Sequence, residues 1–142
     1  MKIYFDTSVL VTALVEQLPH HDSALACLYA ACRDHEAVTS THTLAETYST
    51  LTALPLTRRI PPGEARMIVN ESVRKKLRIL PLSVRIYELA MTRVADRGLT
   101  SGAIYDALHL ESAEVSGCRR LHTYNLGDFQ RLDPGSLTIL AP

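Results

Sequence analysis

The sequence predicts an α/β fold built on a mainly parallel sheet, and two patterns lead to that prediction. Short runs rich in β-branched and aromatic residues alternate with longer segments whose apolar residues recur at helical spacing. Strands that alternate with helices are joined by right-handed crossovers, and these produce a parallel sheet. The 142 residues, 46% of them hydrophobic, suffice for a buried core and argue against disorder. We find no repeat, low-complexity tract or linker, so we expect one domain over residues 1–142.

The first predicted strand, residues 2–5, runs directly into Asp6, Thr7 and Ser8. Ligands bind at the carboxyl ends of the strands in open α/β sheets, so this strand places Asp6 at the edge where function is expected. Pro81 should close the third strand, because proline cannot donate to the ladder. The other predicted strands cover residues 37–40, 77–82, 120–123 and 137–140.

Apolar residues at spacings of three and four predict the helices. Pro55 should end the third helix, because the residue before a proline disfavours helical geometry. Ser83 and Ser101 are suitable N-caps for the last two long helices. Gly98 and Gly117 suit the positions just after their ends. The predicted helices cover residues 7–15, 20–33, 43–54, 63–75, 84–96 and 102–116, and residues 125–129 form a turn or a short helix.

Charge and cysteine content exclude several classes of protein. Fifteen basic and fifteen acidic residues cancel, so we expect no general affinity for polyanions, although a local basic patch is compatible with this balance. The cysteines Cys27, Cys32 and Cys118 are odd in number and form no CxxC pair, which indicates neither a disulfide framework nor a zinc site and favours a reducing cytoplasm. Asp6 interrupts the apolar N-terminal run, unlike a signal peptide, and no stretch is long enough to span a membrane.

Four acidic residues stand where the predicted fold could bring them together. Asp6 and Asp128 follow predicted strands, while Glu46 and Asp106 lie early in helices that begin at the same edge of the sheet. At ~4 Å and an effective dielectric constant of about 20, each pair of carboxylates costs about 4 kcal/mol. Such a cluster requires raised pKa values or a divalent cation, and oxygen ligands favour Mg²⁺ or Mn²⁺. The chemistry of such a site is metal-assisted hydrolysis, usually of phosphate esters.

Each of these acids also has a purely structural interpretation. Asp6 could be only a helix N-cap, and Glu46 could close a capping box with Thr43. Asp106 could occupy an exposed polar helix face, and Asp128 could simply form a turn. Taken singly, the residues leave both interpretations open.

The histidines give no ligand pattern in the sequence. His109 lies one helical turn after Asp106, but an oxygen site for a hard cation does not call for imidazole, so we do not expect His109 to be a ligand. The remaining histidines show no ligand spacing: His20, His21, His35, His42 and His122.

Four short motifs occur in order along nearly the whole chain. They are Phe5-Asp6-Thr7-Ser8, Leu44-Ala45-Glu46, Tyr105-Asp106-Ala107-Leu108 and Thr123-Tyr124-Asn125-Leu126-Gly127-Asp128-Phe129. In order and spacing these motifs resemble those of the PIN-domain nucleases. The size of the chain is most similar to the VapC-type toxins of bacterial toxin–antitoxin pairs.

This resemblance implies a three-layer α/β/α sandwich with a central, mainly parallel sheet of four to five strands. It also implies a cytoplasmic endoribonuclease toxin that depends on Mg²⁺ or Mn²⁺, forms a homodimer and is inhibited by a cognate antitoxin. Asp6, Glu46, Asp106 and Asp128 would form its catalytic quartet, with Asp6, Asp106 and Asp128 as metal ligands.

The same resemblance assigns supporting roles around the quartet. Ser8, Thr123 and Asn125 would support the acids by hydrogen bonding. The fourth acidic position varies in the family and can fall at Asn125 or at Asp128; here only Asp128 is an acid. The basic segment 58–78 is a solvated helix face or, alternatively, a contact surface for RNA phosphates.

Other functions fit the residues less well. A receiver-like domain would need a second early acid and a late lysine, but no lysine follows Lys76. A DxD phosphatase would need a second aspartate after Asp6. A catalytically inactive PIN fold that binds protein is the main alternative, and the complete quartet argues against it.

Overall fold

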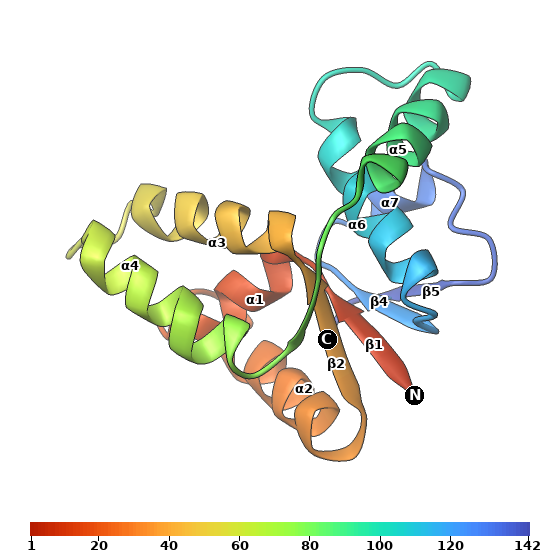
Figure 1. Cartoon of the computed structure of the whole chain (residues 1–142). Helices are drawn as coiled ribbons and strands as arrows, with labels where there is room; N and C mark the ends of the chain where they lie inside the picture. The colour runs from red at the N-terminus through yellow and green to blue at the C-terminus, as the bar shows by residue number, and fades with distance from the viewer.

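A parallel sheet of five strands crosses the molecule in the computed structural model, which describes residues 1–142 (Figure 1). The strand order is β3-β2-β1-β4-β5, and every neighbouring pair is parallel. The predicted parallel sheet is therefore confirmed. The strands are β1 (Lys2–Phe5), β2 (Glu36–Ser40), β3 (Arg78–Leu80), β4 (Arg120–His122) and β5 (Thr138–Leu140).

Helices occupy the segments between the strands, close to their predicted bounds. Ser83 caps its helix as predicted, since its side chain accepts a hydrogen bond from the Ile86 amide at 3.3 Å. The helices are α1 (Thr7–Leu14), α2 (His21–Asp34), α3 (Thr41–Ala53), α4 (Pro62–Ile68), the π-helix η1 (Val69–Arg74), α5 (Val84–Asp96), α6 (Ala103–Val115) and α7 (Leu126–Gln130).

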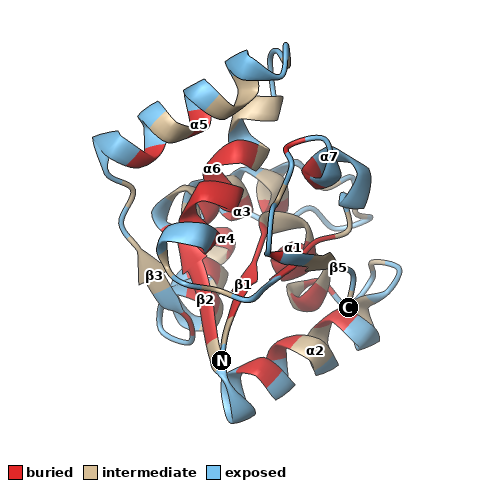
Figure 2. Cartoon of the chain, turned by 90° about the vertical axis from the view of Figure 1, so that its right-hand side faces the viewer, coloured by how far each residue is buried: buried red, intermediate tan, exposed pale blue.

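The side chains of β1 explain why helices cover both faces of the sheet. Successive side chains of a strand point to opposite faces. Tyr4 packs into a core formed with α5, α6 and α7, whereas Ile3 and Phe5 pack into a second core formed with α1, α2 and η1. Figure 1 shows these two groups of helices on opposite sides of the strands, and Figure 2 shows β1 and β2 buried between them. The three-layer α/β/α sandwich is confirmed.

Two local predictions differ from the structure. Ser101 does not cap α6, because its φ of 53° is left-handed, whereas an N-cap residue has extended backbone geometry; Gly102 precedes α6 and provides no side-chain cap. The helix predicted over 63–75 changes to π geometry at Val69, where the Lys75 amide donates to the Asn70 carbonyl at 3.1 Å. Val69 packs in a core formed with α1 and α3, and Val73 packs in the core formed with α2 and β1.

No helix combines the length and the apolar character that crossing a lipid bilayer requires.

A buried ion pair holds α5 against α6. Arg93 donates from Nε to Glu111 at 2.5 Å and from Nη2 to Glu114 at 2.9 Å. Its Nη1 donates to the carbonyls of Leu132 and Asp133, both at 2.9 Å, so one side chain joins α5, α6 and the loop before β5. The side chains of Arg93 and Glu111 are only 14% and 6% exposed.

Arg93→Ala should lower the free energy of unfolding by about 3–5 kcal/mol, because it leaves the Glu111 carboxylate buried without a partner. Arg85→Ala is the matched control, since Arg85 is exposed and lies 3.8 Å from Glu88; it should cost less than about 1 kcal/mol. Urea denaturation followed by circular dichroism measures both values, and equal losses in the two variants would contradict this account.

Candidate active site

Asp6 lies at the carboxyl end of β1 and is almost completely buried, with 2% of its surface exposed. Its Oδ1 accepts hydrogen bonds from the Val9 amide at 3.2 Å and from Ser8 Oγ at 2.7 Å. Its Oδ2 accepts from Thr123 Oγ1 at 2.6 Å. Asp6 is therefore the N-cap of α1, and it also joins the ends of β1 and β4.

Ser8 and Thr123 form a small network around Asp6. While each hydroxyl donates to Asp6, Ser8 Oγ accepts from the Tyr124 amide at 3.0 Å and Thr123 Oγ1 accepts from the Asn125 amide at 2.9 Å. The segment that follows β4 is thus held against the start of α1. The geometry places both predicted supporting hydroxyls in contact with the Asp6 carboxylate.

The Asp106 carboxylate, in the first turn of α6, accepts no hydrogen bond from the protein; it is not completely buried. Burial raises the pKa of Asp106 to about 6; the charge of His109 lowers it, while the charges of Asp128, Asp6 and Glu46 add to the rise. Asp106 therefore experiences the field of all three other acids, as expected for a cluster.

Glu46 is oriented by residues from two other helices. Its Oε1 accepts hydrogen bonds from Thr7 Oγ1 at 2.8 Å and from His109 Nε2 at 2.5 Å. Burial alone would raise the pKa of Glu46, but the neighbouring imidazoles of His109 and His42 lower it below its usual range. The capping-box interpretation is wrong, because α3 begins at Thr41 and Glu46 lies beyond its first turn.

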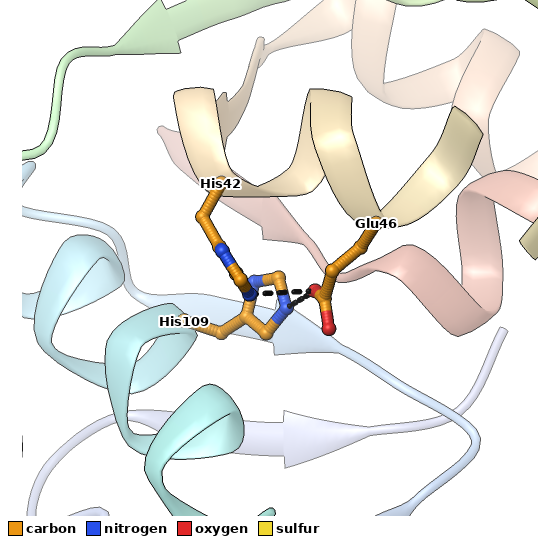
Figure 3. A group of neighbouring side chains, drawn as sticks. All are labelled: His42, Glu46 and His109. Atoms are coloured by element: carbon orange, nitrogen blue, oxygen red, sulfur yellow. Dashed lines mark hydrogen bonds and ion pairs between the residues drawn. The ribbon is translucent and has the colours of Figure 1, made fainter. Parts of the chain in front are cut away.

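His109 is a site residue that the sequence analysis missed. It is 2% exposed, and its Nε2 contacts Glu46 (Figure 3). Its Nδ1 lies 3.0 Å from Tyr4 Oη. Burial opposes a charge on this ring, but the Tyr4 oxygen, the hydrogen bond to Glu46 and the charge of Asp6 raise the pKa of His109 above its ordinary value. The available signal was its spacing from Asp106, since residues three apart share a helix face.

Asp128 lies at the outer side of this group, in α7. Its side chain is exposed and accepts from Arg131 Nη2 at 3.3 Å. Asn125, just before α7, is also exposed and makes no side-chain cap. Asp128 influences Asp106 through its charge, and the choice between Asn125 and Asp128 as the fourth acidic position stays a prediction.

The basic segment 58–78 forms exposed ion pairs. Lys75 lies 2.7 Å from Glu71, and Arg78 lies 2.8 Å from Glu36. These pairs agree with a solvated face, while contact with RNA phosphates stays a prediction.

The donor set fits a divalent cation such as Mg²⁺ or Mn²⁺. These ions prefer carboxylate oxygens as ligands. A bound ion also relieves the repulsion between carboxylates that lie close together. Asp106 offers a carboxylate without a protein partner, and Asp6 accepts three hydrogen bonds out of about four lone-pair directions, which leaves one free.

Comparison with known proteins identifies relatives of this chain. The PIN domain profile matches residues 3–134. Ribonuclease VapC27 of Mycobacterium tuberculosis is 38% identical over 103 residues, which cover 72% of this chain and 70% of that protein. Ribonuclease VapC40 of the same species is 30% identical over 116 residues, which cover 82% of this chain and 81% of that protein.

Solved structures share the fold. The M. tuberculosis toxin VapC20, described as cleaving the sarcin–ricin loop, superposes with a TM-score of 0.71 at 19% identity over 90% of this chain and 92% of that one. The structure of the Rickettsia felis VapBC2 complex bound to a promoter DNA fragment superposes with a TM-score of 0.69 at 22% identity. The match covers 99% of this chain and 97% of that one.

Asp106→Asn should stabilise the metal-free protein at about pH 7.5 by roughly 1–2 kcal/mol, after allowance for solvent screening. The reason is that a raised pKa makes the charged carboxylate less favourable in the folded protein than in the unfolded chain. The folded pKa of about 6 exceeds the ordinary 3.8, so the gain should be complete above pH 6 and vanish as the pH falls toward about 4. Thermal denaturation in EDTA measures it. Glu16→Gln, at an exposed acid outside the cluster, should show no such pH-dependent gain.

Proposed function

The chain belongs to the PIN-domain family as a relative of the VapC ribonucleases, and on this premise we propose that it is an endoribonuclease that requires Mg²⁺ or Mn²⁺. One observation carries the proposal: the Asp106 carboxylate has no hydrogen-bond partner in the protein, and its pKa is raised among three other acids. Such a group is suited to bind a cation.

Asp6, Asp106 and Asp128 would hold the ion. When bound, it would stabilise the negative charge that develops on a phosphodiester during hydrolysis. Ser8 and Thr123 hold Asp6 in one orientation, since each donates to a different carboxylate oxygen. Asn125 would act through the loop that its amide anchors to Thr123.

Glu46 would orient the attacking water. Thr7 and His109 both bind its Oε1, so Oε2 stays available for a further hydrogen bond. A lowered pKa makes Glu46 a weak base, so it acts by positioning the water rather than by removing its proton. This role requires the carboxylate charge.

The partners proposed for the chain are an RNA substrate, a second copy and an antitoxin in the cytoplasm. The Rickettsia felis VapBC2 complex shares the fold of this chain, which supports an antitoxin partner. Val84 and Met91 of α5 are 76% and 54% exposed, an apolar surface suited to a homodimer. A basic antitoxin segment would inhibit by entering the acidic site.

A catalytically inactive PIN fold that binds protein is the competing function. The acids of the site argue against it, because a binding module has no need for four carboxylates that repel one another.

Asp106→Asn should reduce RNA cleavage in Mg²⁺ by at least ~10²-fold, on the scale of a lost electrostatic group at a reacting centre. EDTA should stop cleavage by the wild-type protein, and added Mn²⁺ should restore it. Glu16→Gln serves as the control and should keep the wild-type rate. Full cleavage in EDTA, or by Asp106→Asn, would falsify a metal-dependent site at these acids.

Glu46→Gln should lower the cleavage rate by about 10²-fold, because the amide retains an oxygen for Thr7 but loses the charge that orients water. Rates should be measured well below the melting temperature, since the change leaves His109 without its charged partner and costs about 1–3 kcal/mol. A stable, fully active Glu46→Gln protein would limit the site to the three aspartates.

A further inference from the structure

A second set of donor groups shares Glu46 with the four acids. His42, Glu46 and His109 bring one ligand atom each to within 4.8 Å of one another, from α3 and α6 (Figure 3). Two imidazoles and one carboxylate differ in chemistry from the aspartates, because imidazole favours Zn²⁺, Co²⁺ and Ni²⁺ over Mg²⁺.

The distances from Glu46 Oε1 to the two imidazoles are compatible with a tetrahedral ion. Ligand atoms about 2.05 Å from Zn²⁺ lie roughly 3.3 Å from each other in tetrahedral geometry. His42 Nε2 is already 3.4 Å from Glu46 Oε1. His109 Nε2, at 2.5 Å from the same oxygen, makes a hydrogen bond that would open by less than about 1 Å when an ion replaces its proton.

The surroundings of the two imidazoles resemble those of metal ligands. His42 Nε2 is buried and makes no hydrogen bond of good geometry, and it lies 3.4 Å from Glu46 Oε1. The His42 ring stacks on Tyr105 with ring centroids 5.4 Å apart and an interplanar angle of 8°. The far nitrogen of His109 contacts Tyr4 Oη, as a ligating histidine usually does with an outer partner.

A surface pocket reaches two of the three proposed ligands, His42 and Glu46. This pocket of about 270 Å³ is lined by His42, Ala45, Glu46, Ser49 and Tyr105. The pocket leaves room for water or another ligand in a fourth coordination position.

We propose that His42, Glu46 and His109 bind a transition-metal ion of the Zn²⁺ class, and that this ion inhibits RNA cleavage. Inhibition follows because Glu46 cannot coordinate the ion and orient the attacking water at the same time. The binding is independent of the nuclease function proposed above, whereas the inhibition rests on it.

Binding is tested with Co²⁺, whose visible absorption reports a tetrahedral nitrogen and oxygen site, in excess Mg²⁺ to occupy the aspartates. The wild-type protein and Asp106→Asn should both show the visible absorption band of tetrahedral Co²⁺. Added Zn²⁺ should displace Co²⁺ and abolish that band. His42→Ala should bind Co²⁺ at least ~10-fold more weakly, on the scale of a lost group at a metal site. His35→Ala, at an exposed histidine outside the cluster, should bind as wild type.

Absence of the band in wild type, or an unchanged band in His42→Ala, would overturn the metal site. His42→Gln provides a second variant that retains a polar side chain, and circular dichroism checks the fold of both. A band lost in Asp106→Asn but kept in His42→Ala would assign the ion to the aspartates and likewise refute the proposal.

Inhibition is tested by titrating Zn²⁺ into RNA cleavage assays at saturating Mg²⁺. Each variant is compared with its own rate in Mg²⁺ alone, because His42 Nε2 lies 3.4 Å from the catalytic Glu46 Oε1 and its removal alters that rate as well. Relative to that rate, His42→Ala should require at least ~10-fold more Zn²⁺ for half inhibition. Equal inhibition of wild type and His42→Ala would overturn the regulatory role. If no variant cleaves RNA while the Co²⁺ band follows the expected pattern, the nuclease proposal fails and the metal site stands.

Discussion

Repulsion between carboxylates gathered at one edge of the sheet is the constraint on which the site depends. Asp6 is buried, and Asp106 lies close enough to Asp6, Glu46 and Asp128 for their charges to raise its pKa. Folding alone does not favour such an arrangement, since each charge increases the cost of the others. Burial raises the pKa of both Asp6 and Asp106, and the neighbouring His109, whose own pKa is raised, partly opposes that rise.

The fold supplies the rigidity that such a cluster needs. Three hydrogen bonds fix Asp6 between α1 and the end of β4, and Thr7 and His109 fix one oxygen of Glu46. These contacts join segments that are far apart in the sequence, and the parallel sheet brings them together. Asp128, in the exposed helix α7, is held only by Arg131 and is the least constrained of the four acids.

Glu46 belongs to two candidate sites that suit different classes of metal ion. On one side are the aspartates, which suit hard cations; on the other are two imidazoles, which suit ions of the Zn²⁺ class. The two proposed metal sites share this carboxylate, which would let the protein respond to the kind of metal present. Thr7 and His109 set the conformation of the Glu46 carboxylate. The contacts that would orient it toward an attacking water therefore also restrict how it could coordinate an ion of the Zn²⁺ class.

The sequence by itself determined the succession of strands and helices along the chain, the parallel sheet and the place of the four acids relative to these elements. It could do so because periodicity and strand-to-helix alternation are local signals. It did not reveal the π geometry at Val69 or the left-handed backbone at Ser101, which depend on packing around each segment. Nor did it reveal the contact of His109 and His42 with Glu46. Those residues lie on two helices, and only the tertiary structure decides which helix faces meet and so which side chains share a buried charge.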